Sequence, residues 1–356
     1  MFGWHWERSH PPRPYPSVGE ERAIVRTPRA VLSVVAAALG GLLLTAGQFA
    51  PAQAAGPTDT ADAADAAAAE LPDTAVFHNY PANVHRWVAD NPNDSRRPLI
   101  EQRIASQPQA VWFSAYRPAT VTQDVAEVTS AATAAGEVPV LVSYMIPNRD
   151  CGGASAGGAP TFAAYLDWAE DFAAGLGGAP SVVILEPDSL ALTTCLNPTQ
   201  RAERFNALAD AADLIHAASP AARVYFDAGH SGWHSPATMA ATLREAGVLE
   251  SGDGIYSNVS NYHTTANESA FARAVLAQLG DPDLRAVIDT SRNGNGPLGS
   301  EWCDPPGRLV GQNPTAATGD NLIDAYLWIK LPGELDGCDG PAGSFSPAKA
   351  YELAGG

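Results

Sequence analysis

Residues 182–192, "VVILEPDSLAL", decide how the rest of the chain is interpreted. The apolar run at 182–185 predicts a strand buried on both faces of a sheet. It ends abruptly at two carboxylates, Glu186 and Asp188, on either side of Pro187. A solvated loop would explain this ending. The alternative is that a buried strand delivers an acid to the rim of a site, and the ends of the other strands distinguish the two.

Short apolar runs alternate with Ala-rich helical patterns from about residue 75 onward. The segments 161–176 and 199–218 show the helical patterns most clearly. Such alternation predicts an α/β fold, a parallel β/α barrel of the TIM type with its active site at the carboxyl ends of the strands. Seven strands are expected, at 110–114, 138–146, 182–185, 223–226, 254–259, 285–288 and 325–329.

Six of these seven expected strands end in, or are followed by, polar or charged residues. One strand-end aspartate is more often a turn or helix cap than a catalyst. In a parallel barrel, however, all carboxyl ends of the strands meet at one face. The repeated polar ending therefore indicates a functional face. Its residues are Tyr144, Arg149, Asp150, Asp188, Asp227, Asn258, Asp289, Arg292 and Lys330.

The composition is typical of a globular chain with a large core: 356 residues, 46% hydrophobic and 17% charged. A net charge of −18 argues against nucleic acid or an anionic membrane as the partner. A neutral polysaccharide meets no such repulsion. No internal repeat and no second module is visible, and we expect a monomer.

The first residues have the pattern of a secretory signal peptide. Arginines precede a weakly apolar stretch at 30–46, and an Ala-x-Ala pattern ends at Ala54. An uncleaved anchor helix is the alternative. Residues 55–72, rich in Ala and Asp, are expected to form a flexible leader, although the alanines could form a transient helix. Residues 1–54 are thus predicted to be removed, and 73–356 to form one catalytic domain of a secreted, extracellular protein.

Four cysteines, an even number, suggest disulfides in an exported chain, with three possible connectivities. Sequential pairing is the simplest of the three. A zinc site competes with this interpretation, but no C-x-x-C spacing is present to favour it.

Seven stretches of the chain together resemble glycoside hydrolase family 6, whose members are secreted cellulases, either endo-β-1,4-glucanases or cellobiohydrolases. The resemblance runs from about residue 75 to the C-terminus and keeps the family's motif order. It implies a distorted barrel of seven parallel strands, cleavage with inversion, no metal or other cofactor, and the disulfides Cys151–Cys195 and Cys303–Cys338. The stretches are "SYMIPNRDCGG" (143–153), "LEPDSLAL" (185–192), "YFDAGHSGW" (225–233), "NVSNYH" (258–263), "IDTSRNGNGP" (288–297), "EWCDPPGR" (301–308) and "LWIKLPGELDGC" (327–338).

Inverting hydrolysis needs one acid to protonate the leaving oxygen and one base to activate water. By the resemblance Asp188 is the acid, and Asp150 is the neighbouring carboxylate that keeps it protonated by repulsion. Asp336 matches the carboxylate proposed as base, with a plain turn residue as the alternative. Tyr144 matches the tyrosine beneath the −1 sugar, with core packing as the alternative.

The resemblance also implies a set of substrate-binding residues. Tryptophans in glycine-containing loops suit stacking against pyranose rings, and polar side chains suit hydroxyl groups. For His230 a structural hydrogen bond is an equal alternative, and the glycine-rich segment 152–160 is expected to be a mobile lid or a flexible connection. The binding residues are Trp233, Trp302, Lys330, Glu334, Asp227, His230, Asn258 and Asn261.

In the family that the chain resembles, cellobiohydrolases roof the cleft with long loops. Only about 20 residues separate Cys303 from the seventh expected strand here, so the resemblance implies an open cleft and endo-acting rather than exo-acting cleavage. Two other classes stay open: a metal-dependent hydrolase using Asp227 and His230, and a glucan-binding protein without activity. The preferred glucan does not follow from the sequence.

Overall fold

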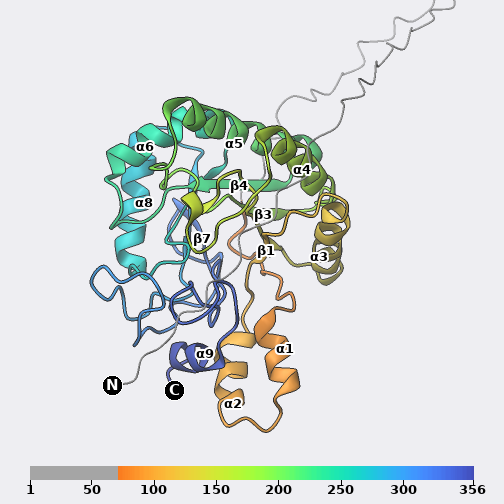
Figure 1. Cartoon of the computed structure of the whole chain (residues 1–356), viewed down its shortest axis with the longest axis vertical. Helices are drawn as coiled ribbons and strands as arrows, with labels where there is room; N and C mark the ends of the chain where they lie inside the picture. The colour runs from red at the N-terminus through yellow and green to blue at the C-terminus, as the bar shows by residue number, and fades with distance from the viewer. Residues whose placement is uncertain (1–70) are drawn as a thin grey trace, which may run out of the picture. The chain divides into compact units, whose positions relative to one another are not determined.

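The computed structural model describes residues 71–356. The predicted signal peptide (1–54) and nearly all of the predicted leader (55–72) lie outside those residues. Seven parallel strands form one sheet, in the order β1 to β7 along the chain, and the sheet curls into a half-barrel (Figure 1). The strands are β1 Val111–Phe113, β2 Val140–Ser143, β3 Ser181–Leu185, β4 Ala222–Asp227, β5 Gly254–Ser257, β6 Arg285–Asp289 and β7 Ile323–Leu327.

All seven predicted strands are confirmed, but β2, β5 and β7 end earlier than predicted. In β2 and β7 the reason is that carboxylates of neighbouring strands bind the next backbone groups. After β2, the N–H groups of Met145 and Ile146 donate to Glu186 Oε2 at 2.7 and 2.8 Å. After β7, the Lys330 N–H donates to Asp289 Oδ2 at 2.9 Å. These N–H groups bond to side chains in place of a neighbouring strand, so the ladder stops.

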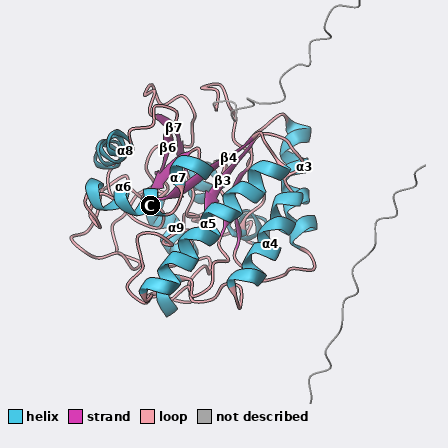
Figure 2. Cartoon of the chain, turned by 90° about the horizontal axis from the view of Figure 1, so that it is seen from above, coloured by secondary structure: helices cyan, strands magenta, loops and turns pink. Residues whose placement is uncertain are grey.

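Helices cover the outside of the sheet (Figure 2), and the two predicted helices are confirmed as α4 and α5. The start of α5 has a capping box between Asn197 and Gln200, with Pro198 as its first residue. The covering helices are α3 Val121–Ala135, α4 Phe162–Ala174, α5 Pro198–Ala218, α6 Pro236–Glu245, α7 Val248–Ser251 and α8 Thr265–Leu279.

A smaller group of helices lies beside the half-barrel, where the beginning and the end of the described chain meet (Figure 1). It has its own apolar cluster, which includes Ile100, Trp328 and Leu353. Its elements are α1 Asn83–Asp90, α2 Arg97–Ile100, the π-helical turn η1 Glu101–Ala105 and α9 Pro347–Leu353, while a 3₁₀ turn, η2 Asp150–Gly152, follows β2.

Strand β3 is buried on both faces, as the apolar run predicts. Val183 and Leu185 pack in the cluster shared with the covering helices, whereas Val182 and Ile184 pack in the cluster on the other face of the sheet. This alternation turns successive side chains to opposite layers. The strand end that carries Asp188 is therefore anchored from both sides.

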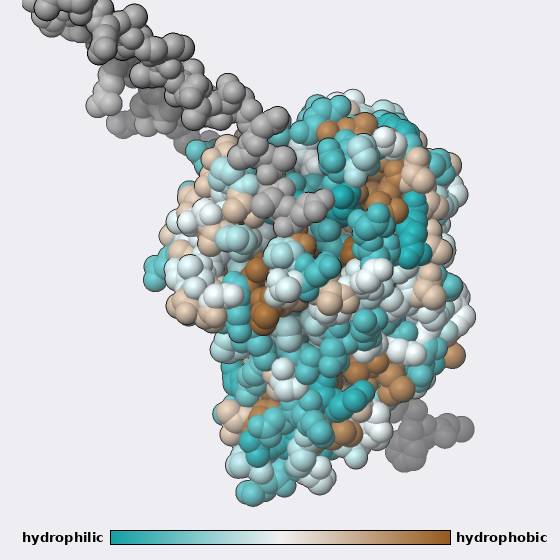
Figure 3. Space-filling view, turned by 180° about the vertical axis from the view of Figure 1, so that it is seen from behind, coloured by the Kyte–Doolittle hydropathy of each residue, from teal (hydrophilic) through white to brown (hydrophobic). Residues whose placement is uncertain are grey.

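Both disulfides implied by the family resemblance are present, Cys151–Cys195 and Cys303–Cys338, with Cα–Cα distances of 5.5 and 5.8 Å. Within residues 71–356, no helix combines the length and the apolarity that a membrane crossing requires. On the face drawn in Figure 3, apolar residues form scattered patches between hydrophilic ones.

Candidate active site

A cavity of about 1140 Å³ contains ten of the twelve residues predicted to act in catalysis or substrate binding. Most come from the segments that follow the carboxyl ends of the strands, where a parallel barrel has its site. Asp227 and Asn258 are the two that do not line it. The ten are Tyr144, Asp150, Asp188, His230, Trp233, Asn261, Trp302, Lys330, Glu334 and Asp336.

Asp188 lies in the tight turn after β3, with φ values of 50° at Glu186 and 67° at Asp188. Such left-handed backbone is uncommon outside glycine and persists where surrounding contacts enforce it. Burial and then the charges of Asp227 and Asp150 raise the pKa of the Asp188 carboxyl to about 8, while Lys330 acts to lower it. Asp150 was expected to be the main cause, but burial and Asp227 contribute more.

Glu186 is the contact that enforces this turn. Its side chain is fully buried and binds the end of β2, accepting the Ser143 hydroxyl at 2.6 Å and the N–H groups of Met145 and Ile146. One carboxylate thus ties the turn that contains Asp188 to the segment that contains Tyr144. The sequence placed Glu186 in the turn but did not identify these partners.

Asp227 and Asn258 support the site from behind. Asp227 accepts the N–H groups of Leu190 and Ala191 at 3.0 and 2.9 Å through Oδ2, and that of Gly229 at 2.8 Å through Oδ1. Asn258 is fully buried, and its amide exchanges hydrogen bonds with the backbone of His263 and donates to the carbonyl of Asp289. Neither side chain lines the cavity, but the charge of Asp227 raises the pKa of Asp188, which fits the expected polar network around the acid.

Arg149 connects Tyr144 to the glycine-rich segment 152–160. Its guanidinium lies 4.2 Å from the centre of the Tyr144 ring, and its Nε donates to the Ser155 carbonyl at 2.8 Å. Asp150 Oδ2 accepts the Ser155 N–H at 2.7 Å. Burial, followed by the charge of Asp188, raises the pKa of Tyr144, which keeps its phenol neutral. In this structure the segment lies against the cavity and is bound by both residues.

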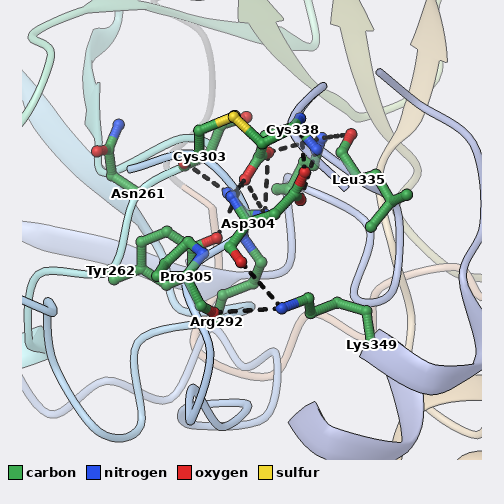
Figure 4. Close-up of polar contacts among 12 residues, drawn as sticks. Asn261, Tyr262, Arg292, Cys303, Asp304, Pro305, Leu335, Cys338 and Lys349 are labelled. Carbon is green, nitrogen blue, oxygen red and sulfur yellow. Dashed lines mark hydrogen bonds and ion pairs between the residues drawn. A yellow bond between two sulfur atoms is a disulfide. The ribbon is translucent and has the colours of Figure 1, made fainter. Parts of the chain in front are cut away.

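Asp336 lies on the loop after β7 and is ion-paired rather than a plain turn residue (Figure 4 shows its surroundings). Arg292 Nη1 contacts its two oxygens at 3.0 and 2.9 Å, Lys330 Nζ lies 3.3 Å from Oδ1, and the Tyr262 hydroxyl donates to Oδ2 at 3.1 Å. Burial opposes ionisation, but Arg292 and then Lys330 outweigh it and hold the pKa of Asp336 below its usual range.

Aromatic and polar side chains suited to sugar rings line the rest of the cavity. Trp302 is 57% exposed at the rim. Trp112 also lines the cavity, with its indole N–H donating to the Ile329 carbonyl at 2.7 Å, and was not predicted. Glu334 accepts from the Asn83 amide at 2.7 Å, and burial raises its pKa.

His230 lines the cavity and stacks on His263, with ring centroids 4.4 Å apart. Burial lowers the pKa of His230 to about 4, helped by His263 and His234, so the ring is neutral near pH 7. Both oxygens of Asp227 accept backbone N–H groups, and Asp227 does not line the cavity that His230 lines. Among residues 71–356, no group of three His, Cys, Asp or Glu side chains is arranged for a metal ion.

Several residues of this site carry no sequence signal that separates them from their neighbours. Tyr262 and Arg292 lie in recognised stretches but contact Asp336 only in the folded chain. Asp304 could have been noticed only from its position next to Cys303. The arrangement as a whole offers a protonated carboxyl, an ionised carboxylate and an aromatic-lined cavity, which together suit acid–base cleavage of a glycan.

Comparison with known proteins agrees with this chemistry. The model of glycosyl hydrolases family 6 matches residues 73–354. Endoglucanase 1 of Streptomyces sp. (strain KSM-9) is 64% identical over 294 residues, which are 82% of this chain and 81% of that protein. Endoglucanase A of Thermobispora bispora is 51% identical over 292 residues, 82% of this chain and 64% of that protein.

Among solved structures, the fold is similar to that of the endoglucanase Cel6 from Mycobacterium tuberculosis in complex with methyl-cellobiosyl-4-deoxy-4-thio-β-D-cellobioside. The TM-score is 0.73 at 41% sequence identity, and the match covers 82% of this chain and 99% of that one.

Proposed function

Because the chain belongs to glycosyl hydrolases family 6, we propose that it cleaves internal β-1,4-glucosidic bonds of cellulose and related β-glucans with inversion of configuration. One observation carries the proposal. Two carboxyl groups of the same cavity have pKa values pushed in opposite directions, to about 8 for Asp188 and below the usual range for Asp336. Pairs of this kind identify the acid and the base of a site.

In this mechanism Asp188 enters the reaction protonated and gives its proton to the oxygen of the leaving sugar. Asp336 is ionised and takes a proton from the attacking water, directly or through a second water. The carbon–oxygen bond to the leaving group breaks as the bond to water forms on the opposite face, which inverts the anomeric centre. No metal is required at any step.

The remaining cavity residues support this step. Tyr144 lies where a neutral phenol can stabilise a distorted sugar ring with developing positive charge. Asp150 adds negative charge that favours the protonated form of Asp188, and it binds the segment 152–160 through Ser155. Trp233 and Trp302 supply stacking surfaces, while Lys330, Glu334, Asn261 and His230 supply hydrogen bonds to hydroxyl groups.

Internal cleavage is favoured over exo-acting cleavage by the shape of the rim. The segment between Cys303 and β7 is short, and Trp302 at the rim is 57% exposed rather than covered by chain. The relatives described above are named endoglucanases. We also propose that the protein is secreted, since two disulfides are typical of exported chains, and that it acts as a monomer.

The test is hydrolysis of carboxymethylcellulose by the purified protein, with viscosity and reducing ends followed together. Endo attack gives a steep early fall in viscosity for few new ends, and proton NMR of fresh cello-oligosaccharide products shows the α anomer first. The matched control is Asp188→Asn, which keeps the shape of the side chain and should lose nearly all turnover. Reducing ends that accumulate while viscosity persists would contradict endo action, and β products would contradict inversion.

A further inference from the structure

Asp304 follows Cys303 in the loop between β6 and β7, and its buried carboxylate binds the loop that carries Asp336. Its Oδ1 accepts the N–H of Asp336 at 2.7 Å. Its Oδ2 accepts the N–H groups of the next three residues, 337 to 339, at 3.2, 3.0 and 3.0 Å. Four consecutive backbone N–H groups thus converge on one carboxylate (Figure 4). Charge-assisted hydrogen bonds of this kind are the strong ones in proteins.

The contact also runs in the other direction. The backbone N–H of Asp304 donates to Asp336 Oδ2 at 3.1 Å, so Asp304 binds both the backbone and the side chain of Asp336. Asp304 adopts a left-handed φ of 49°, a conformation that the surrounding contacts must maintain. Lys349 of α9 contributes to this by donating to the Asp304 carbonyl at 3.0 Å.

The disulfide between Cys303 and Cys338 joins the same two loops, but it does not by itself orient Asp336. It sets a Cα–Cα distance of 5.8 Å between residues adjacent to Asp304 and two positions beyond Asp336. The direction of the Asp336 side chain depends on the backbone at 336–339, which the Asp304 carboxylate binds at every N–H. A misplacement of about 1 Å in a reacting group can lower a rate by about 10²-fold.

We propose that Asp304 is a positioning residue that holds the Asp336 carboxylate in the geometry needed to activate water. Asp304 does not line the cavity and acts only through Asp336. The inference rests on the proposed function, in which Asp336 is the base. It assigns to the "EWCDPPGR" stretch a role beyond forming a disulfide and presenting Trp302.

The first test is Asp304→Asn. A carboxamide presents an NH₂ group to at least one of the four N–H donors. The hydrogen bonds that hold the loop at 336–339 are therefore weakened, while the side-chain volume is kept. We expect kcat on cellotetraose to fall by about 10²-fold, the range of a lost general base, with KM changed less than about threefold. Asp304→Glu keeps the charge, and its kcat should lie between those of wild type and Asp304→Asn. This variant provides the test if Asp304→Asn folds poorly.

Two readouts locate the defect: the first asks whether it lies on the acid side of the reaction, and the second asks whether it acts through Asp336. First, a cellobioside with a 2,4-dinitrophenyl leaving group needs no proton from Asp188. It should therefore rescue Asp188→Asn but not Asp304→Asn. Second, the double variant Asp304→Asn with Asp336→Asn should be no slower than Asp336→Asn alone, since both remove one function.

The matched control is Asp253→Asn. Asp253 also accepts a backbone N–H, from Val224 at 2.7 Å, but at the opposite ends of the strands. This variant should lose stability without the selective fall in kcat. The inference would be overturned if folded Asp304→Asn kept near wild-type kcat or were rescued by the activated substrate. Additive losses in the double variant, or full activity of Asp336→Asn, would overturn it as well. Failure of the wild type to hydrolyse β-1,4-glucans would instead reject the proposed function.

Discussion

The opposite pKa shifts of Asp188 and Asp336 predict a bell-shaped dependence of kcat/KM on pH, with a basic limb that depends on Asp150. With its pKa near 8, Asp188 is about nine-tenths protonated at pH 7, whereas an ordinary aspartate is protonated in roughly 1 molecule in 10³. The plateau should therefore extend to about pH 7, and kcat/KM should fall tenfold per unit above about pH 8. The acid limb should lie at low pH, because the pKa of Asp336 is depressed.

Asp150→Asn tests the electrostatic part of this argument. The amide oxygen can still accept the Ser155 N–H, so the substitution removes the charge and keeps the contact. Two like charges that share a cavity repel by roughly 1–3 kcal/mol at an effective dielectric constant of about 20. Solvent in the cavity screens part of this repulsion. We therefore expect the basic limb to move down by about one pH unit, since one unit corresponds to about 1.4 kcal/mol.

The assay is kcat/KM on a soluble cello-oligosaccharide between pH 3 and pH 10 for wild type, Asp150→Asn and a charge-matched control. Asp213→Asn removes one negative charge from the exposed face of α5 and should leave the profile unmoved. The reasoning is refuted if Asp150→Asn leaves the basic limb in place, if the control moves it equally, or if the wild-type limb lies below about pH 6.

Two further predictions concern stability. Glu186→Gln should lower the free energy of unfolding in urea by about 1–3 kcal/mol, because the amide has one acceptor atom where the carboxyl group accepts at both oxygens, from Ser143 and from the N–H groups of Met145 and Ile146; a change below about 0.5 kcal/mol would contradict this. Between about pH 4 and pH 8 the native chain keeps the Asp188 proton that the unfolded chain releases, so this group makes wild-type stability fall as pH rises. The stability gained by Asp188→Asn over wild type should therefore grow between pH 4.5 and pH 8, and a constant difference would exclude the raised pKa.

The strands could be predicted because each is a short apolar run, whereas their ends could not. Burial on both faces explains the unbroken apolar run at 182–185 of β3, which the sequence shows directly. The ends of β2 and β7 depend instead on Glu186 and Asp289, which bind backbone N–H groups 40 or more residues away in the chain. A single sequence does not show which residues so far apart in the chain will be in contact after folding.

Tyr144, Asp150, Asp188 and Lys330, which the strand ends singled out, line one cavity, but the pattern does not say which strand-end residues face it. Asp188 and Asp227 each lie at the end of a strand, yet only Asp188 lines the cavity. The carboxylate of Asp227 points to the backbone of residues 190, 191 and 229. Position at a strand end and orientation of the side chain are separate properties, and the second depends on three-dimensional contacts. Asp304 was missed for the same reason.

The same fold gives two aspartates opposite protonation states by surrounding them with different partners. Apart from burial, the charges that raise the pKa of Asp188 are the carboxylates of Asp227 and Asp150, and Lys330 opposes them. Asp336 has Arg292 and Lys330. Lys330 lowers the pKa of both carboxyl groups, so it cannot be what distinguishes them. The distinction arises from Asp227 on one side and Arg292 on the other, and both are positioned by the carboxyl ends of strands in one sheet. Exchange of the acid and base roles would therefore require changes at Asp227 and Arg292, which do not line the cavity, as well as at the two aspartates.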